Sequence, residues 1–140
     1  HIRRGDKLIK EARRFEVRDY MHHVDHFVHP KRIYHNHYDK NYNATIFVAT
    51  DEPNVLTELQ HKDYSPYTIL TSHHEGVDYR HPDHLRNLLA EVDCLVQSEF
   101  FVGTFSSQIS RLVYELKMGR GAYRGEQLHV ASMDDDYYAS

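Results

Sequence analysis

The sequence has little of several features that place a protein in a particular class. It contains a single cysteine, Cys94, which cannot form an internal disulfide and whose apolar neighbours predict a buried thiol, not a nucleophile. No apolar run approaches the roughly 20 residues that a membrane-spanning helix needs, which predicts a soluble segment. An initiator methionine and a charged-then-apolar leader are both missing, and we expect a segment of a longer chain.

Neither sign of charge dominates. Seventeen basic and 21 acidic side chains leave a net charge of -4 with neutral histidines, which argues against nucleic acid as a partner. The 13 histidines would erase or reverse this charge in a compartment of pH about 6. With 140 residues, 40% hydrophobic and 27% charged, the chain is expected to form a single globular domain over residues 1–140.

Short β-branched and aromatic runs alternate with amphipathic stretches along the chain. The runs predict strands over 45–50, 67–71, 100–104 and 128–131, the first buried on both faces, while residues 1–4 resemble the end of a strand that starts earlier. Apolar spacing predicts helices over 17–28, from Pro53, from Pro82 and after Ser106 or Ser107. Pro30 is expected to end the first helix before an exposed insertion over 29–43. Gly119 and Gly121 are expected to end the last helix. This alternation predicts an α/β fold with a doubly wound parallel sheet.

A basic loop follows the first strand end. Arg3, Arg4 and Lys7 lie there with the carboxylates of Asp6 and Glu11. Arginine offers a planar fork of donors to phosphate oxygens and lysine a compact positive charge, so the loop could bind phosphate. A solvated charged loop is the alternative.

A second loop, residues 104–108, lies between a predicted strand and a predicted helix. Its hydroxyls, the Gln108 amide and the backbone N–H groups at the helix start could bind an anion, although Ser106 or Ser107 could instead be an ordinary N-cap. A diphosphate needs both charge and directed donors, which the two loops together would supply.

Three carboxylates on other segments have two interpretations each. Asp51 follows a predicted strand and could bind a sugar or orient a base, or could favour the positive end of the next helix. Glu91 and Asp93 are two residues apart on a predicted helix and do not share a face. One of them could accept from the N–H groups of guanine, or both could be solvated.

The histidines suggest a metal site only weakly. His22 and His26 would lie one turn apart on a helix near His23 and Asp25, and His35 and His37 are also close in sequence. No HExxH motif is present and no glutamate or cysteine completes a ligand set, so we interpret these residues as surface histidines and expect no metal.

The segments HIRRGDK (residues 1–7) with Glu11, ATDEP (49–53) and FVGTFSSQISRLVYE (101–115) resemble, in order and spacing, the donor-binding half of α-1,6-fucosyltransferases. The similarity extends to Tyr20-Met21 and to DDDYY at 134–138. The resemblance implies a Rossmann-like C-terminal lobe of a two-lobed, GT-B-like glycosyltransferase. It also implies transfer of fucose from GDP-fucose, with inversion and without a metal or another cofactor, to the innermost N-acetylglucosamine of an N-glycan.

The resemblance further implies roles for individual residues. Arg3 and Lys7 would hold the diphosphate with Ser107 and Gln108, Glu11 would be the general base, and Asp51 would support the site. His1 would contact the nucleoside part of the donor. Glu91 occupies the position at which the family is expected to have an aspartate that binds guanine. Arg4 and Asp6 would also bind the donor.

The acceptor-facing N-terminal lobe and any C-terminal SH3-like module are expected to lie outside these residues. The resemblance implies a dimeric type II membrane protein of the Golgi lumen as the parent. A catalytically inactive module of the same fold that binds a sugar nucleotide or a glycan remains the alternative.

Overall fold

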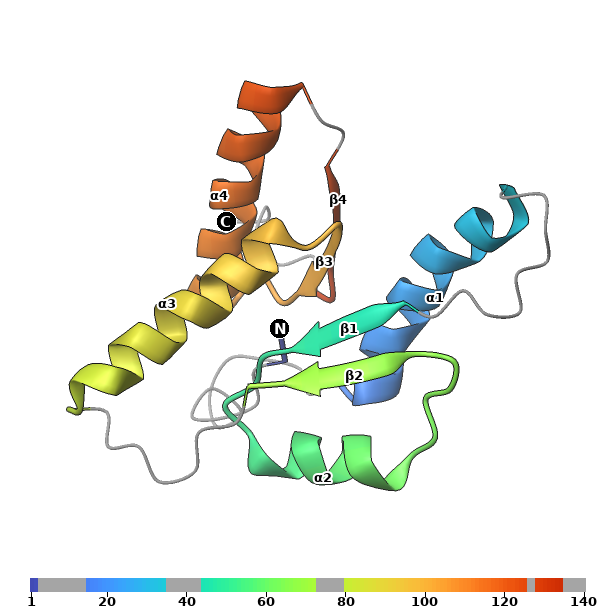
Figure 1. The fold of residues 1–140 in the computed structure, drawn as a ribbon, viewed down its shortest axis with the longest axis horizontal. Helices are drawn as coiled ribbons and strands as arrows, with labels where there is room; N and C mark the ends of the chain where they lie inside the picture. The colour runs from blue at the N-terminus through green and yellow to red at the C-terminus, as the bar shows by residue number, and fades with distance from the viewer. Residues whose placement is uncertain (3–14, 35–43, 73–79, 126–127, 135–140) are drawn as a thin grey trace.

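The structure is a computed structural model that describes residues 1–2, 15–34, 44–72, 80–125 and 128–134. Helices and strands alternate along these residues, as predicted (Figure 1). The elements are α1 (Val17–Tyr34), β1 (Thr45–Val48), α2 (Pro53–His61), β2 (Thr68–Thr71), α3 (Pro82–Gln97), β3 (Phe100–Gly103), α4 (Gln108–Arg124) and β4 (His129–Ser132). None of these helices is long and apolar enough to span a membrane.

The strands form two parallel pairs. β1 pairs with β2 in the register Thr45 to Thr68, and β3 pairs with β4 in the register Phe100 to His129. His1 and Ile2 lie between the two pairs: the Ile2 N–H donates to the Ala49 carbonyl at 2.9 Å, and the His1 amino group donates to the Val102 carbonyl at 2.8 Å. Ile2 also forms a parallel bridge with Thr50. The start of the chain thus touches the carboxyl ends of both β1 and β3.

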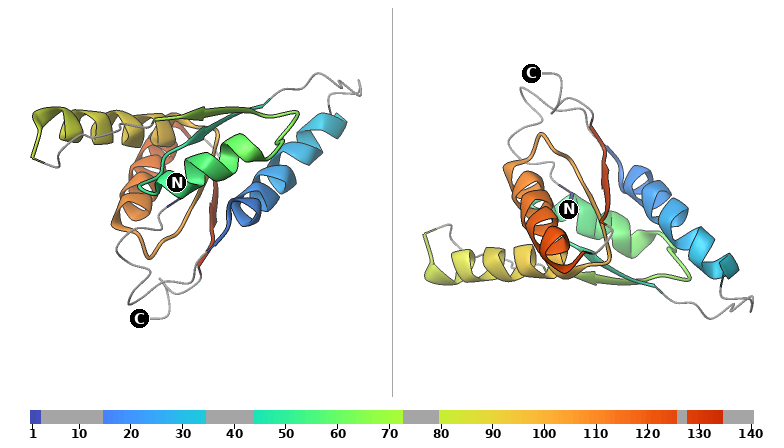
Figure 2. Two further views of the ribbon diagram at one scale, coloured as in Figure 1. Left: turned by 90° about the horizontal axis from the view of Figure 1, so that it is seen from below. Right: turned by 90° about the horizontal axis from the view of Figure 1, so that it is seen from above.

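Helices cover both faces of the strands, in pairs. Ile46 and Val48 of β1 pack with the buried residues of α1 and α2, whereas Phe47 and Ala49 pack with those of α3 and α4. Successive side chains of a strand point to opposite faces, so α1 and α2 lie on one face and α3 and α4 on the other (Figure 2). This α/β arrangement is compatible with the predicted Rossmann-like fold.

Two predicted helix ends are wrong. α1 continues through Pro30 to Tyr34, which the helical φ angle of proline permits, although Pro30 has no N–H to donate to the preceding turn. The predicted insertion therefore begins as helix, and residues 35–43 lie outside the described part. α4 passes through Gly119 and Gly121 and ends at Gly125, whose φ of 66° is left-handed. A glycine ends a helix where the backbone takes that conformation.

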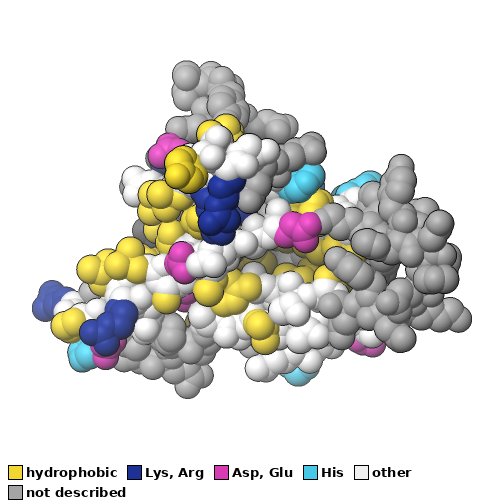
Figure 3. Space-filling view, turned by 45° about the horizontal axis from the view of Figure 1, so that its top comes forward, with side chains coloured by type: hydrophobic (Ala, Val, Ile, Leu, Met, Phe, Trp, Pro, Cys, Tyr) yellow, Lys and Arg dark blue, Asp and Glu magenta, His cyan; other side chains and the backbone are white. Residues whose placement is uncertain are grey.

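Burial is less complete than the apolar pattern predicted. In β1, predicted to be buried on both faces, Thr45 is exposed and only Val48 is fully buried. In α3, Val92 and Leu95 are buried, but Leu85 and Leu89 are 59% and 57% exposed. The amino-terminal half of α3 extends away from the other elements (Figures 1 and 2), and hydrophobic side chains are exposed over α3 and α4 (Figure 3).

A buried lysine joins α3 to α4. Lys117 of α4 is only 4% exposed, and its Nζ donates to the Val96 carbonyl at 3.1 Å and to the Ser98 carbonyl. The last carbonyls of a helix have no partner within the helix and carry partial negative charge. Lys117 satisfies these carbonyls and fixes the carboxyl end of α3, which leads directly into β3.

Candidate functional site

The carboxyl ends of the strands gather several of the predicted site residues. Ile2, from which the basic loop leaves, is bridged to Thr50 just after β1. At the end of β3, the Gly103 carbonyl accepts from the N–H of Met133, just after β4. Ligands of open α/β sheets bind beyond such strand ends. The two loops predicted to bind a diphosphate therefore start at one edge of the strands.

Ser107 has the most unusual environment at this edge. It occupies the N-cap position of α4, is 2% exposed, and its hydroxyl has no hydrogen-bond partner. The ordinary N-cap interpretation predicted a side-chain bond to the first turn of α4, and that bond is not formed. An unpartnered buried hydroxyl is costly, and the helix start beside it offers N–H donors and a positive dipole end. The start of α4 can therefore accommodate an anion.

Asp134 organises the loop before α4. Its carboxylate accepts from the backbone N–H of Phe105 at 2.5 Å and of Ser106 at 3.1 Å, and from the Ser132 hydroxyl at 2.9 Å. Burial alone would raise the pKa of Asp134, but hydrogen bonds from Ser106, Ser132 and the loop backbone outweigh it and lower the pKa below 3.8. Asp134 therefore stays ionised and links the end of β4 to the loop after β3.

This contact corrects one expectation about the loop. The N–H groups of Phe105 and Ser106, predicted to be available to an anion, are already bound to Asp134, and the Ser107 N–H is bound to the Thr104 carbonyl at 2.9 Å. The donors left for an anion are the Ser107 hydroxyl and the first turn of α4. Sequence reasoning gave Asp134 no role in the site; the residue appeared only as the first of the DDDYY segment (134–138), three residues after the last predicted strand.

His1 and Gly103 hold the first turn of α4 against β3. The His1 Nδ1 atom lies 2.9 Å from the Oγ atom of Ser110, which is fully buried. A Cβ atom on Gly103 would lie 2.7 Å from Ser110 Oγ and 2.8 Å from the Phe101 ring, closer than real Cβ contacts. Glycine is therefore required at 103 for α4 to start this close to the strand.

Of the three carboxylates on other segments, Asp51 and Glu91 lie near the ends of β1 and β2. Asp51 is exposed and follows Thr50, whose hydroxyl accepts from the Glu52 N–H at 3.1 Å. Glu91 of α3 is half-buried and accepts from the Ser72 hydroxyl at 2.6 Å, just beyond β2. Asp93 is exposed and bound to Gln97 instead. Of Glu91 and Asp93, only Glu91 is hydrogen-bonded to a residue that directly follows a strand.

The histidines and the cysteine lie elsewhere. The Nε2 atoms of His22 and His26 are 3.1 Å apart on α1, and Asp25 accepts from the hydroxyl of Tyr67. Within the described residues no three metal-ligating side chains come together, and His35 and His37 lie outside them. Cys94 is exposed, so the predicted buried thiol is wrong; it lines a cavity between β1 and β3 that its apolar neighbours do not fill.

Comparison with known proteins agrees with the resemblance seen in the motifs. A family model described as "Alpha-(1,6)-fucosyltransferase N- and catalytic domains" matches residues 1–138. The chain belongs to this fucosyltransferase family. It is 31% identical over 142 residues to an alpha-(1,6)-fucosyltransferase of Caenorhabditis elegans and 29% identical over 143 residues to one of Drosophila melanogaster. These matches cover 98% and 99% of the chain but 24% and 22% of the relatives.

The chain is thus a fucosyltransferase-family segment that spans about a quarter of these relatives. Of the donor-binding residues implied by the family resemblance, His1, Ser107 and Gln108 lie at or beside the first turn of α4, with Gln108 exposed as its first residue. Arg3, Arg4, Asp6, Lys7 and Glu11 lie outside the described residues. Their roles remain predictions, as do those of Asp51 and Glu91.

Proposed function

We propose that this fucosyltransferase segment binds the diphosphate of GDP-fucose at the strand ends and that its parent enzyme transfers fucose to the innermost N-acetylglucosamine of N-glycans. One observation carries the proposal. Ile2, from which the basic loop leaves, is bridged to Thr50 just after β1, and His1 beside it donates to the Val102 carbonyl of β3. The helix that follows β3 begins with a buried, unpartnered hydroxyl. Cationic side chains and directed donors would therefore meet at one place.

The chemistry of the transfer suits these groups. The acceptor hydroxyl oxygen forms a bond to the anomeric carbon of fucose, the bond from that carbon to the phosphate oxygen breaks, and its electron pair remains on the diphosphate. Arg3 and Lys7, with Ser107 and the start of α4, would stabilise this developing charge. Glu11 would take the proton of the acceptor hydroxyl. A single displacement of this kind inverts the anomeric carbon and includes no metal or other cofactor.

The nucleoside and the acceptor would be held by other groups. In this proposal His1 and Glu91 lie toward the guanosine, and Asp51 supports the site beside the basic loop, to which Arg4 and Asp6 also belong. The acceptor glycan would be held largely by the N-terminal lobe of a GT-B-like parent. We also propose that the parent is a dimeric type II membrane protein of the Golgi lumen.

Substitution of one arginine tests the diphosphate role. In the parent enzyme, Arg3→Ala should abolish measurable turnover of GDP-fucose and weaken GDP binding in calorimetry. Arg18→Ala is the matched control, because Arg18 is exposed on α1 and paired with Glu16 at 3.1 Å. Unchanged turnover in Arg3→Ala would refute the proposed role. An unsubstituted parent that binds GDP but releases no product from GDP-fucose would instead identify an inactive binding module.

A further inference from the structure

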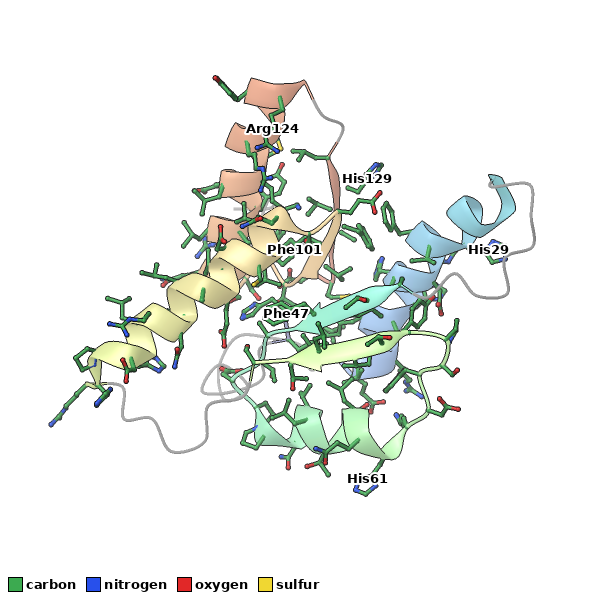
Figure 4. The ribbon with its side chains drawn as sticks, viewed as in Figure 1. His29, Phe47, His61, Phe101, Arg124 and His129 are labelled. Carbon is green, nitrogen blue, oxygen red and sulfur yellow. The ribbon has the colours of Figure 1, made fainter. Side chains whose placement is uncertain are left out.

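A cavity of about 490 Å³ separates the two pairs of strands. Phe47 of β1 and Phe101 of β3, labelled in Figure 4, line it from the two strands. Its remaining walls are mainly apolar side chains of α1 and the carboxyl end of α3, including Val24, Phe27, Val28, Cys94 and Leu95. His1 and Ile2 close one end. The cavity is thus bounded by strands on two sides and by helices on the two faces.

The bounding strands each have one edge without a partner strand. Among the described strands, β1 pairs only with β2 and β3 only with β4. The residues of both strands that line the cavity are 45–48 and 100–102, so the two free edges face each other across it. A strand edge presents a row of N–H and C=O groups that require hydrogen-bond partners, and an apolar ligand could not supply them.

The contacts of His1 and Ile2 show what fits between these edges. Ile2 is parallel to Thr50 on the β1 side, and the His1 nitrogen donates to the Val102 carbonyl on the β3 side. These two residues already make strand-like contacts to both neighbours. Burial lowers the pKa of the His1 amino group from 8.0 to about 5, so a charged group is disfavoured here. A neutral peptide N–H would make the same bond to Val102 without that cost.

We propose that the cavity is the seat of a β-strand of the parent polypeptide that leads directly into His1 and runs parallel to β1 and β3. This strand would join the two pairs into one sheet, in the order β2, β1, inserted strand, β3, β4. The relatives are about four times as long as the matched segment, so chain is available to supply such a strand. The strand would be about as long as β1 and β3, which have four residues each.

This order has a consequence for the position of the ligand site. From the inserted strand the chain winds outward through β1 and β2, then returns to the other side for β3 and β4. Ligands in open α/β sheets bind beyond the strand ends where the winding reverses. That point is the end of the inserted strand, where the basic loop leaves Ile2. The proposal concerns the sheet and does not depend on the proposed transferase activity.

Cys94 provides a direct probe, because its exposed side chain lines the cavity and the proposed strand would cover it. In the folded parent protein, Cys94 should react with a maleimide at least about tenfold more slowly than after unfolding in urea, as followed by mass spectrometry of its peptide. A cysteine in Asp93→Cys is the matched control, since Asp93 is exposed on α3 and does not line the cavity. It should react quickly in the folded protein.

Hydrogen exchange on the same parent protein tests the occupant. The amides of residues 46–48 and 100–102 should be protected, together with amides of the segment that precedes His1. Rapid labelling of Cys94 in the folded parent would overturn the proposal. Slow labelling combined with rapid exchange of the preceding segment would also overturn it, because another occupant, such as a small apolar molecule, would then fill the cavity.

Discussion

Replacing Asp134 by asparagine should loosen the loop that precedes α4. The carboxylate accepts from two backbone N–H groups, those of Phe105 and Ser106, and from the Ser132 hydroxyl. The two N–H groups bind different carboxylate oxygens, and an amide keeps only one of these, so at least one N–H loses its carboxylate acceptor. Such a loss at this half-buried position costs about 1–3 kcal/mol. A cost of one to two kcal/mol changes an opening equilibrium by a factor of about 5–30.

Hydrogen exchange of the parent protein measures this opening directly. The Phe105 and Ser106 amides should exchange about 5–30 times faster in Asp134→Asn than in the unsubstituted protein. Asp93→Asn is the control, because Asp93 is exposed on α3 and its carboxylate accepts from the side-chain amide of Gln97, away from this loop. Equal exchange of the loop amides in Asp134→Asn and the unsubstituted protein would refute the role assigned to Asp134.

The same substitution should change the response to acid. Because the pKa of Asp134 is lowered in the folded protein, its stabilising contribution is complete above the ordinary pKa of 3.8 and is lost as the pH falls through the lowered value. The difference in loop exchange between Asp134→Asn and the unsubstituted protein should therefore shrink as the pH falls below 3.8. A difference that grew with acidity would contradict the direction of the pKa shift.

Three further substitutions test separate contacts. Ser107→Ala removes a buried hydroxyl without a partner, so the midpoint of urea unfolding should hardly change. The Kd for GDP, measured by calorimetry, should rise about tenfold. Unaltered GDP binding would show that Ser107 is not part of the site. Lys117→Met removes two hydrogen bonds to the end of α3 and should lower the free energy of unfolding, measured by urea titration, by about 2 kcal/mol. An unchanged midpoint of urea unfolding would contradict the proposed role of Lys117 in fixing the end of α3. Gly103→Ala places a methyl group 2.7 Å from Ser110 Oγ, so the melting temperature should fall by an amount equivalent to about 1–3 kcal/mol. An unchanged melting temperature would contradict the close approach of α4 to β3.

Local patterns predicted the elements but not all of their ends. The alternation of strands and helices and the start of α3 at Pro82 follow from apolar spacing and from proline at a helix start, both of which are properties of neighbouring residues. Pro30, Gly119 and Gly121 are equally strong local signals, yet the helices continue through them. Their effect depends on the backbone conformation at each site, which packing of the rest of the helix determines.

The candidate site was predictable only in part. Loops after strands were identified as site segments, and the family of the chain followed from residues 1–7 and 101–115. The role of Asp134 in holding the loop before α4 was not predictable, because its partners lie 28 and 29 residues away in the chain and no local pattern signals a carboxylate bound to a distant loop. The buried, unpartnered hydroxyl of Ser107 was also invisible, because sequence shows a serine before a helix and predicts a cap.

By itself the sequence determined which segments become strands and helices, where charged and hydroxyl-bearing loops fall, and to which family the chain belongs. Only the tertiary structure decided which side chains are covered, which donors remain available at the start of α4, and that a cavity separates β1 from β3. The reason is physical: secondary structure depends on the spacing of residues a few positions apart, whereas burial and hydrogen-bond partnership depend on residues that folding brings together from distant parts of the chain.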